Sequence, residues 1–310
     1  MRFIFAAFLS IVLPAIAAAS SPPMPVPRPA SIPAEPARAE GPAPRSVAKE
    51  LFGRMRNAAP LRARAIGTYA KGCLAGAVAL PVDGENWQAM RLSRNRNWGH
   101  PELIAMLERL AAKVPKVSNW NGILVGDLAQ PRGGPMLTGH ASHQLGLDAD
   151  VWLTPMPDRK LSAEEREKIS ATMMVRKDRL DIDPANWTPG HMHVIKAAAD
   201  DPLVERVLVN AAIKKALCRE AGDDRKWLGK VRPYWGHDYH MHIRIGCPED
   251  STDCEKQNPV SGDDGCGKEL DYWFRPAIIS PPPPKEPPKP RPPLLMSDLP
   301  PACRQVLIAR

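Results

Sequence analysis

Several motifs that would assign this 310-residue chain to a familiar enzyme class are absent from it. It contains no His-Glu-x-x-His, so the glutamate base of the zincin peptidases is missing. Ser46-Val-Ala-Lys49 matches the Ser-x-x-Lys of penicillin-binding serine enzymes, but neither Ser-Asp-Asn nor Lys-Thr-Gly occurs. No recognised nucleic-acid-binding module is present either. These absences argue against a zincin, a serine penicillin-binding enzyme and a nucleic-acid-binding protein.

Long apolar runs are also scarce, and the N-terminal one, at residues 3–16, is short for a membrane span and is interrupted by Pro14. Arg2 precedes this run, and three alanines at 17–19 form a small-residue cleavage pattern before Ser20. No cysteine that could carry a lipid follows the cleavage position. We therefore predict a signal peptide at 1–19, export, and no stable membrane insertion; an uncleaved membrane anchor is the alternative.

Two proline-rich stretches flank the rest of the chain and predict its domain organisation. Residues 20–47 are dense in Pro and Ala and form a predicted extended linker, and 277–310 comprise a polyproline segment and a tail. Between them, 48–276 are sufficient for one domain with a substantial core. Pro101 and an apolar stripe predict a helix at 100–114, and the capping box Ser162-Ala-Glu-Glu165 predicts one that extends to about Met174. Strands are predicted at 122–127 and 203–210, and a further helix at 211–220. Without a regular βαβ rhythm, this pattern indicates a single α+β domain with a central antiparallel sheet.

The stretch His237-Asp-Tyr-His240-Met-His242-Ile-Arg244-Ile alternates polar and apolar residues from His240 onward, as a strand does. His240, His242 and Arg244 therefore share one face. Residues two apart on a strand lie about 7 Å apart and point the same way. One histidine could bind a metal while the other acts beside it; the alternative is a solvated sheet face without chemistry.

A second stretch, at 139–153, ends in another alternating segment, with Asp148 and Asp150 on the side opposite its apolar residues. A turn at Gly146 could carry His143 back over Asp150. With His242, these residues would give two nitrogen ligands and one oxygen ligand. Three protein ligands and a fourth position for water are typical of a catalytic zinc site rather than a structural one.

His191-Met-His193 also has the spacing His-x-His, but it follows Thr188-Pro189, a helix cap and first-turn proline. In a helix, residues two apart point in nearly opposite directions. We therefore interpret these two histidines as structural or surface residues.

Six cysteines in an exported chain indicate disulfides, for which 15 pairings exist. Cys247 and Cys254 as metal ligands are the alternative.

The net charge of +8 favours polyanionic partners. For an exported protein, a cell-wall polymer with free carboxylates fits this charge better than nucleic acid. A generic basic protein is the alternative, and the oligomeric state stays open.

The two histidine stretches, "GHASHQLGLDADVWL" and "HDYHMHIRIGCP", resemble the penicillin-insensitive murein endopeptidases. The resemblance extends to "GHPELI" at 99–104, "LVGDLAQPRGG" at 124–134, "AIKKALC" at 212–218, "KVRPYW" at 230–235 and "SGDDGCG" at 261–267, and so spans roughly residues 60–275. It implies an α+β fold, a periplasmic location and disulfides Cys218–Cys266, Cys247–Cys254 and Cys73–Cys303.

The resemblance implies zinc-dependent hydrolysis of the D-alanyl–meso-diaminopimelyl cross-link in peptidoglycan, with zinc on His143, Asp150 and His242. His240 is the expected general base or oxyanion stabiliser, and His237 is expected to assist it. Members of the family can hold a second metal ion, which here would use His140, Asp178 and Asp181. An aspartate replaces the family's histidine at the last position, which predicts a weaker second site. The alternative role of His140 is to support the first site or to contact substrate.

Two other functions remain open at this stage. One is a D,D-carboxypeptidase or dipeptidase that uses the same ligands on uncross-linked stem peptides. The other is a zinc-bearing cell-wall binding module without activity, against which the presence of His237 and His240 beside the ligands argues.

Overall fold

The structure is a computed structural model that describes residues 42–260, 262–282 and 291–310. The predicted signal peptide, most of the predicted N-terminal linker and the middle of the polyproline segment lie outside these residues. No helix among the described residues has both the length and the apolar character needed to cross a bilayer.

Six strands form the central sheet, in the order β4-β6-β7-β10-β8-β9. Their bounds are β4 Trp87–Ala89, β6 Ile123–Val125, β7 Asp148–Trp152, β10 His240–Ile245, β8 Val204–Val209 and β9 Val231–Pro233. The neighbours from β6 through β8 are antiparallel, whereas β4 and β9 at the edges run parallel to their neighbours. The predicted α+β class is confirmed, and the predicted antiparallel arrangement holds for the centre of a mixed sheet.

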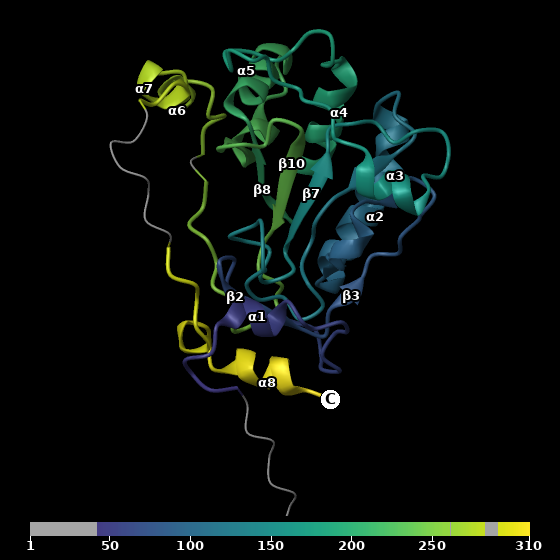
Figure 1. Ribbon diagram of the computed structural model, residues 1–310. Coiled ribbons are helices and arrows are strands. Elements are labelled where there is room, and N and C mark those ends of the chain that lie inside the picture. The colour runs from purple at the N-terminus through teal and green to yellow at the C-terminus, as the bar shows by residue number, and fades with distance from the viewer. Residues whose placement is uncertain (1–41, 261, 283–290) are drawn as a thin grey trace, which may run out of the picture. The chain divides into compact units, whose positions relative to one another are not determined.

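Strands β7 and β10 lie side by side at the centre of the sheet (Figure 1), and every residue in both is buried. Their apolar side chains, Ala149, Val151, Met241 and Ile243, belong to the main core together with residues of α2 and α4. The polar side chains on the opposite face are buried as well. A solvated sheet face, the alternative that the sequence left open, is therefore excluded.

The long helices have the predicted amphipathic character. Helix α2 (Pro101–Val117) begins at the predicted proline, and its buried stripe includes Leu103, Ile104 and Leu107. Helices α4 (Pro189–Ala199) and α5 (Ala211–Glu220) also bury apolar faces in the main core. The remaining short helices and strands are α1 Ala48–Phe52, β1 Arg64–Thr68, β2 Lys71–Ala75, β3 Val78–Ala79, β5 Trp98–Gly99, α3 Ala163–Lys168, α6 Lys268–Trp273, α7 Pro276–Ile279 and α8 Ala302–Ile308.

Helix α3 opens with the predicted capping box at Ser162 but ends at Lys168, so the prediction of a helix to about Met174 was wrong. The next residue, Ile169, is extended, and the guanidinium of Arg91 donates to the carbonyls of Arg166 and Ile169. The residues that follow include Ser and Thr, which compete with helical hydrogen bonding through their own side chains.

The C-terminal segment folds against the β1–β2 hairpin and α1 in a second, smaller core (Figure 1). Cys303 in α8 is bonded to Cys73 in β2. Arg132 donates two hydrogen bonds, of 2.8 and 2.7 Å, to the carbonyls of Val306 and Leu307 near the end of the chain. The tail is therefore an integral part of the folded unit.

All six cysteines are paired as the family resemblance implied. The bridges are Cys73–Cys303, Cys218–Cys266 and Cys247–Cys254. Because Cys247 and Cys254 form a disulfide, the alternative in which they bind a metal is excluded.

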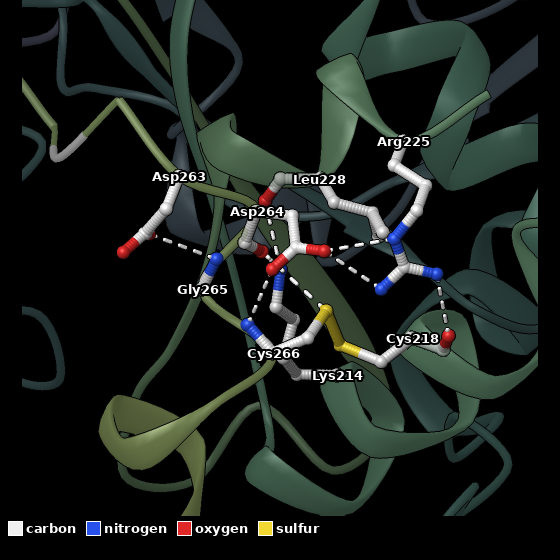
Figure 2. Close-up of a disulfide and its surroundings, with 8 residues drawn as sticks. All are labelled: Lys214, Cys218, Arg225, Leu228, Asp263, Asp264, Gly265 and Cys266. Atoms are coloured by element: carbon white, nitrogen blue, oxygen red, sulfur yellow. Dashed lines mark hydrogen bonds and ion pairs between the residues drawn. A yellow bond between two sulfur atoms is a disulfide. The ribbon is translucent and has the colours of Figure 1, made fainter. Parts of the chain in front are cut away.

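A buried lysine lies beside one of these bridges (Figure 2). The ammonium of Lys214 donates to the carbonyls of Leu228, at 2.8 Å, and Asp264, at 2.6 Å. Asp264 in turn accepts from Arg225, whose guanidinium also reaches the carbonyl of Cys218. Burial lowers the pKa of Lys214 to about 8, from an ordinary value of 10.5.

The lowered pKa of Lys214 predicts a pH-dependent contribution to stability. Between about pH 8 and 10.5 the folded protein binds fewer protons at Lys214 than the unfolded chain, so this residue makes folding more favourable as the pH rises. Relative to Lys214→Met, the wild-type free energy of unfolding should increase between about pH 7.5 and 9.5, by at most about 1.4 kcal/mol per pH unit. Denaturant unfolding at both pH values measures this difference.

Lys168, which forms an exposed ion pair with Glu164, provides the control. Lys168→Met controls for the loss of one lysine charge at an exposed position. A Lys214→Met effect that is constant across this range would contradict the prediction.

Candidate metal centre

The register between β7 and β10 brings the polar residues of the two sequence motifs together. Asp150 lies opposite His242, and Asp148 lies opposite Arg244. Since side chains two apart on a strand share a face, the carboxylates and imidazoles meet on the side of the sheet that faces away from the helices.

His143 reaches this face from the loop that precedes β7. Its backbone has a φ of 66°, and Gly146 after it has a φ of 67°. A Cβ at Gly146 would lie 2.3 Å from a methyl group of Leu74, so glycine is needed there both for its conformation and for space. The His143 amide donates to Asp148 at 2.9 Å, and the side chain is fully buried. The predicted return of His143 over Asp150 is thus present.

The side chain of Asp150 lies at the centre of three histidines. Its Oδ1 is 3.2 Å from His242 Nδ1, 3.4 Å from His143 Nε2 and 3.6 Å from His240 Nε2. Asp150 Oδ1, both ring nitrogens of His143 and Nδ1 of His240 are buried without a hydrogen bond to any described residue. Buried polar atoms normally have partners. A borderline cation such as Zn²⁺ prefers nitrogen and oxygen ligands. Asp150 and the histidines around it offer such atoms without other partners, so they fit a metal ion.

The electrostatics of the centre also favour a cation. Burial alone would raise the pKa of Asp150, but the adjacent His143 and His240 hold it well below its ordinary value. Burial alone would lower the pKa of His242, but Asp148 and Asp150 raise it to about 9. Two ionised carboxylates in a buried site thus require positive charge between them, which a proton on His242 or a metal ion can supply.

Asp148 is completely buried beside the centre and connects several of its residues. It accepts hydrogen bonds from His242 Nε2 at 3.0 Å and from Arg244 Nε at 2.6 Å, in addition to the His143 amide. Burial would raise its pKa, but Arg244 and His242 keep it well below the ordinary value. With Nε2 of His242 bound to Asp148, Nδ1 is directed at Asp150. A histidine held by a carboxylate in this way is typical of metal ligands.

His140 extends the centre toward a carboxylate that the sequence analysis missed. His140 Nε2 lies 3.0 Å from Asp127 Oδ2 and 3.6 Å from Asp150 Oδ2. Ligand atoms of His140, His143 and Asp150 all lie within 4.8 Å of one another, so this group could also hold a metal ion. Asp127 follows the buried strand β6 in the motif "LVGD", and a carboxylate at the end of the strand predicted at 122–127 was the signal that could have found it.

Asp178 and Asp181, expected at a second metal position, bind cations of the protein instead. Asp178 pairs with Arg176, and Asp181 pairs with Lys215 at 3.2 Å and with Arg219 at 3.1 Å. Within the described residues, neither belongs to a group of side chains that could hold a metal ion with His140.

The two expected catalytic histidines border the centre. The rings of His237 and His240 lie 4.7 Å apart, and burial lowers the pKa of both, that of His237 to about 4. Nδ1 of His237 is 2.7 Å from the carbonyl of Trp235. By contrast, His191 is buried in α4 against Trp120 and Trp187, as expected for a structural residue.

Two clefts border the centre and share His140. The first, of about 310 Å³, is lined by Arg91, Arg94, Asp127, His140, Asp150, Tyr239 and His240, among others. The second, of about 970 Å³, is lined by His140, His237, His242, Arg206, Arg232, Lys256 and neighbouring residues. His140 contributes to both, so an extended ligand could pass from one cleft to the other across the histidines.

The fold and this centre define an α+β protein whose central sheet carries a histidine–aspartate group suited to a metal ion. The family model described as penicillin-insensitive murein endopeptidase matches residues 65–308. The chain therefore belongs to the penicillin-insensitive murein endopeptidase family. The match includes the C-terminal segment that the sequence motifs had left outside the resemblance.

Several curated relatives carry the same description. The protein from Haemophilus influenzae is 47% identical over 215 residues, which are 69% of this chain and 74% of the relative. That from Pectobacterium atrosepticum is 43% identical over 244 residues, 79% of this chain and 84% of the relative. That from Klebsiella pneumoniae is 42% identical over 245 residues, 79% of this chain and 86% of the relative.

The contacts of Asp148 predict that Asp148→Asn destabilises the protein and loosens the centre. The change leaves the guanidinium of Arg244 buried without its countercharge, which typically costs about 3–5 kcal/mol. It also weakens the orientation of His242, so metal affinity should fall by about 10- to 100-fold. Denaturant unfolding and metal titration measure the two effects.

Glu164→Gln, at an exposed ion pair on α3, is the matched control and should leave both quantities nearly unchanged. If Asp148→Asn unfolds and binds metal as the wild type does, Asp148 does not have this role.

Proposed function

We propose that this protein is an exported, zinc-dependent murein endopeptidase that hydrolyses the amide between D-alanine and meso-diaminopimelate in peptidoglycan cross-links. The observation that carries the proposal is the buried Asp150 oxygen surrounded by nitrogen atoms of three histidines, in a chain of the murein endopeptidase family. A signal peptide at 1–19 and a periplasmic location belong to the same proposal.

His143, Asp150 and His242 are the proposed zinc ligands. His143 offers Nε2 and His242 offers Nδ1, because these are the ring nitrogens nearest Asp150. When bound, zinc would polarise the scissile carbonyl and lower the pKa of a water molecule toward neutrality. A second ion at His140 would require Asp178 and Asp181 to give up their ion pairs with Arg176, Lys215 and Arg219, so we propose one ion.

His240 is the proposed proton carrier. Its pKa is lowered by burial, so the ring is neutral near pH 7 and can accept a proton. It contacts the centre from the same strand as His242 without being one of the three proposed ligands. His237 is the proposed assistant: the carbonyl of Trp235 accepts from its Nδ1, which leaves Nε2 as an acceptor.

The clefts favour an endopeptidase over a carboxypeptidase. A substrate cut within a cross-link has peptide on both sides of the scissile bond, and two clefts that border the histidines could each hold one part of it. The net charge of +8 suits a polymer that bears free carboxylates. Insensitivity to penicillin follows from a reaction that uses no serine nucleophile that penicillin could acylate.

Removal of a proposed ligand should remove zinc. His143→Ala, Asp150→Ala and His242→Ala each leave two protein ligands at a site that needs three, so each purified variant should contain little zinc. Atomic spectroscopy measures the metal content. His193→Ala, in α4 on the surface, is the matched control and should keep its zinc. The ligand set would be refuted if all three variants retained one full equivalent of zinc even when His140 was replaced as well.

Replacement of His240 should separate catalysis from metal binding. His240→Ala is expected to keep zinc and fold while it loses about 10²- to 10⁴-fold in turnover, the usual contribution of general acid–base catalysis. Chromatography of cross-linked muropeptide dimers, with and without a chelator, measures the reaction. The wild type should convert dimers to monomers, stop when zinc is removed and ignore penicillin.

The same assay distinguishes the alternatives. If the zinc-loaded wild type leaves dimers intact, the endopeptidase proposal is wrong. If it releases only terminal D-alanine, the protein is a carboxypeptidase. Wild-type turnover by His240→Ala would show that the proton carrier is another residue.

A further inference from the structure

The first cleft contains an arginine with unused hydrogen-bonding capacity. Arg94 lines this cleft with His140 and His240, and its side chain is 47% exposed. Its Nη1 donates to Asp127 Oδ2 at 3.0 Å, and among the described residues Nε and Nη2 have no hydrogen-bond acceptor. A guanidinium has five N–H donors in a planar fork, so most of the donors of Arg94 remain available to a ligand in the cleft.

Short contacts connect Arg94 to the metal centre. The same Asp127 oxygen is 3.0 Å from His140 Nε2, which is 3.6 Å from Asp150 Oδ2. A group bound by Arg94 would therefore lie close to a bond that reacts at the histidines.

The turn that carries Arg94 is rigidly held. Arg91 before it and Asn95 after it both have left-handed backbones, with φ of 56° and 51°. Glu167 accepts from the amide and hydroxyl of Ser93, each at 2.9 Å, and the guanidinium of Arg91 is fixed by carbonyls at the end of α3. Non-glycine residues in this conformation are costly and concentrate at functional sites. Such anchoring places the Arg94 side chain in advance of binding.

The charges of the two clefts differ. In the first, Arg91 is bound by neutral carbonyls, and Arg94 shares Asp127 with Arg96 and His140. The second cleft carries cations too, but Glu255 and Glu269 also line it, and Glu269 pairs with Arg232. The first cleft also contains the carboxylates of Asp127 and Asp150, so a ligand anion would be recognised there by the available donors of the half-exposed Arg94 and not by the net charge of the cleft.

We propose that Arg94 binds the free carboxylate next to the scissile amide on the amine side of the substrate, and thereby determines which half of the cross-link occupies the first cleft. This inference rests on the proposed function. In the proposed cross-link, the carbon that bears the amide nitrogen also bears a free carboxylate. A planar guanidinium and a carboxylate can form two parallel charge-assisted hydrogen bonds. The acyl half of the substrate then extends into the second, larger cleft.

The test compares two muropeptide dimers that differ at this one carboxylate, which is either free or converted to the amide. The wild type should cut the amidated dimer about 10- to 100-fold more slowly, as expected when a charge-assisted pair is lost. Arg94→Gln should cut both dimers at the same rate, close to the wild-type rate on the amidated one. Arg94→Lys keeps the charge without the fork and should retain part of the preference.

Arg109→Gln is the matched control. It removes one arginine charge from α2, where Arg109 pairs with Asp201, and it should keep the full wild-type preference for the dimer with the free carboxylate. A second readout needs no turnover: calorimetry with zinc-free protein, which holds the dimers without cutting them, should show the same ratio of affinities.

The outcomes separate this proposal from the proposed function. A preference retained by Arg94→Gln, or a wild type that cuts and binds both dimers equally, overturns the role of Arg94 while endopeptidase activity stands. If the wild type cuts neither dimer, the proposed function fails. In that case the calorimetry decides the role of Arg94. If the zinc-free wild type binds both dimers with equal affinity, the carboxylate site is overturned as well. If the affinities differ and Arg94→Gln abolishes the difference, the carboxylate site is supported.

Discussion

The buried charge of Asp148 is the constraint on which the centre depends. One carboxylate, with no exposed surface, binds the guanidinium of Arg244, the imidazole of His242 and the backbone amide of His143. Two of these partners come from β10 and one from the loop before β7, the strand that carries Asp148 itself. A protein is strongly destabilised when a buried ion pair loses one partner. The positions of β7, β10 and the His143 loop therefore depend on one another through Asp148. The proposed metal ligands therefore depend for their relative positions on Asp148, which is not itself one of them.

The C-terminal segment reinforces the same loop from the other side. Gln144, next to His143, donates to the carbonyl of Ala70 and accepts from the amide of Gly72 in the β1–β2 hairpin. Cys73 in that hairpin is bonded to Cys303 of the tail. A bridge across a separation of 230 residues restricts the unfolded chain over most of its length. The tail thus stabilises the hairpin on which the histidine loop rests.

The local features of the sequence were sufficient to predict much of this arrangement. Strict alternation in β7 and β10 identified which residues share a face, and the proline and cap signals identified α2 and α4. The disulfide pairs came from the family resemblance, since spacing alone cannot select one of the pairings. Helix α3 was predicted too long because Arg91, distant in the sequence, takes the carbonyls at its end.

Features that depend on several segments at once could not be predicted locally. Nothing in the local pattern states that Asp127 reaches His140, because that contact requires β6 to pair with β7 in the observed register. The burial of the polar face likewise depends on loops whose path is set by left-handed residues such as His143 and His237. No sequence period marks such residues.

The left-handed backbone of His143 and the unpartnered atoms around Asp150 favour a metal ion over a proton as the proposed partner of Asp150. A proton on His242 could neutralise the two carboxylates, but it would leave both ring nitrogens of the buried His143 without hydrogen-bonding partners among the described residues. A cation on the three proposed ligands would bind Nε2 of His143 together with Asp150 and Nδ1 of His242, and would release the proton from His242. The left-handed backbone of His143 would then have a physical reason, because it brings the third proposed donor to the other two.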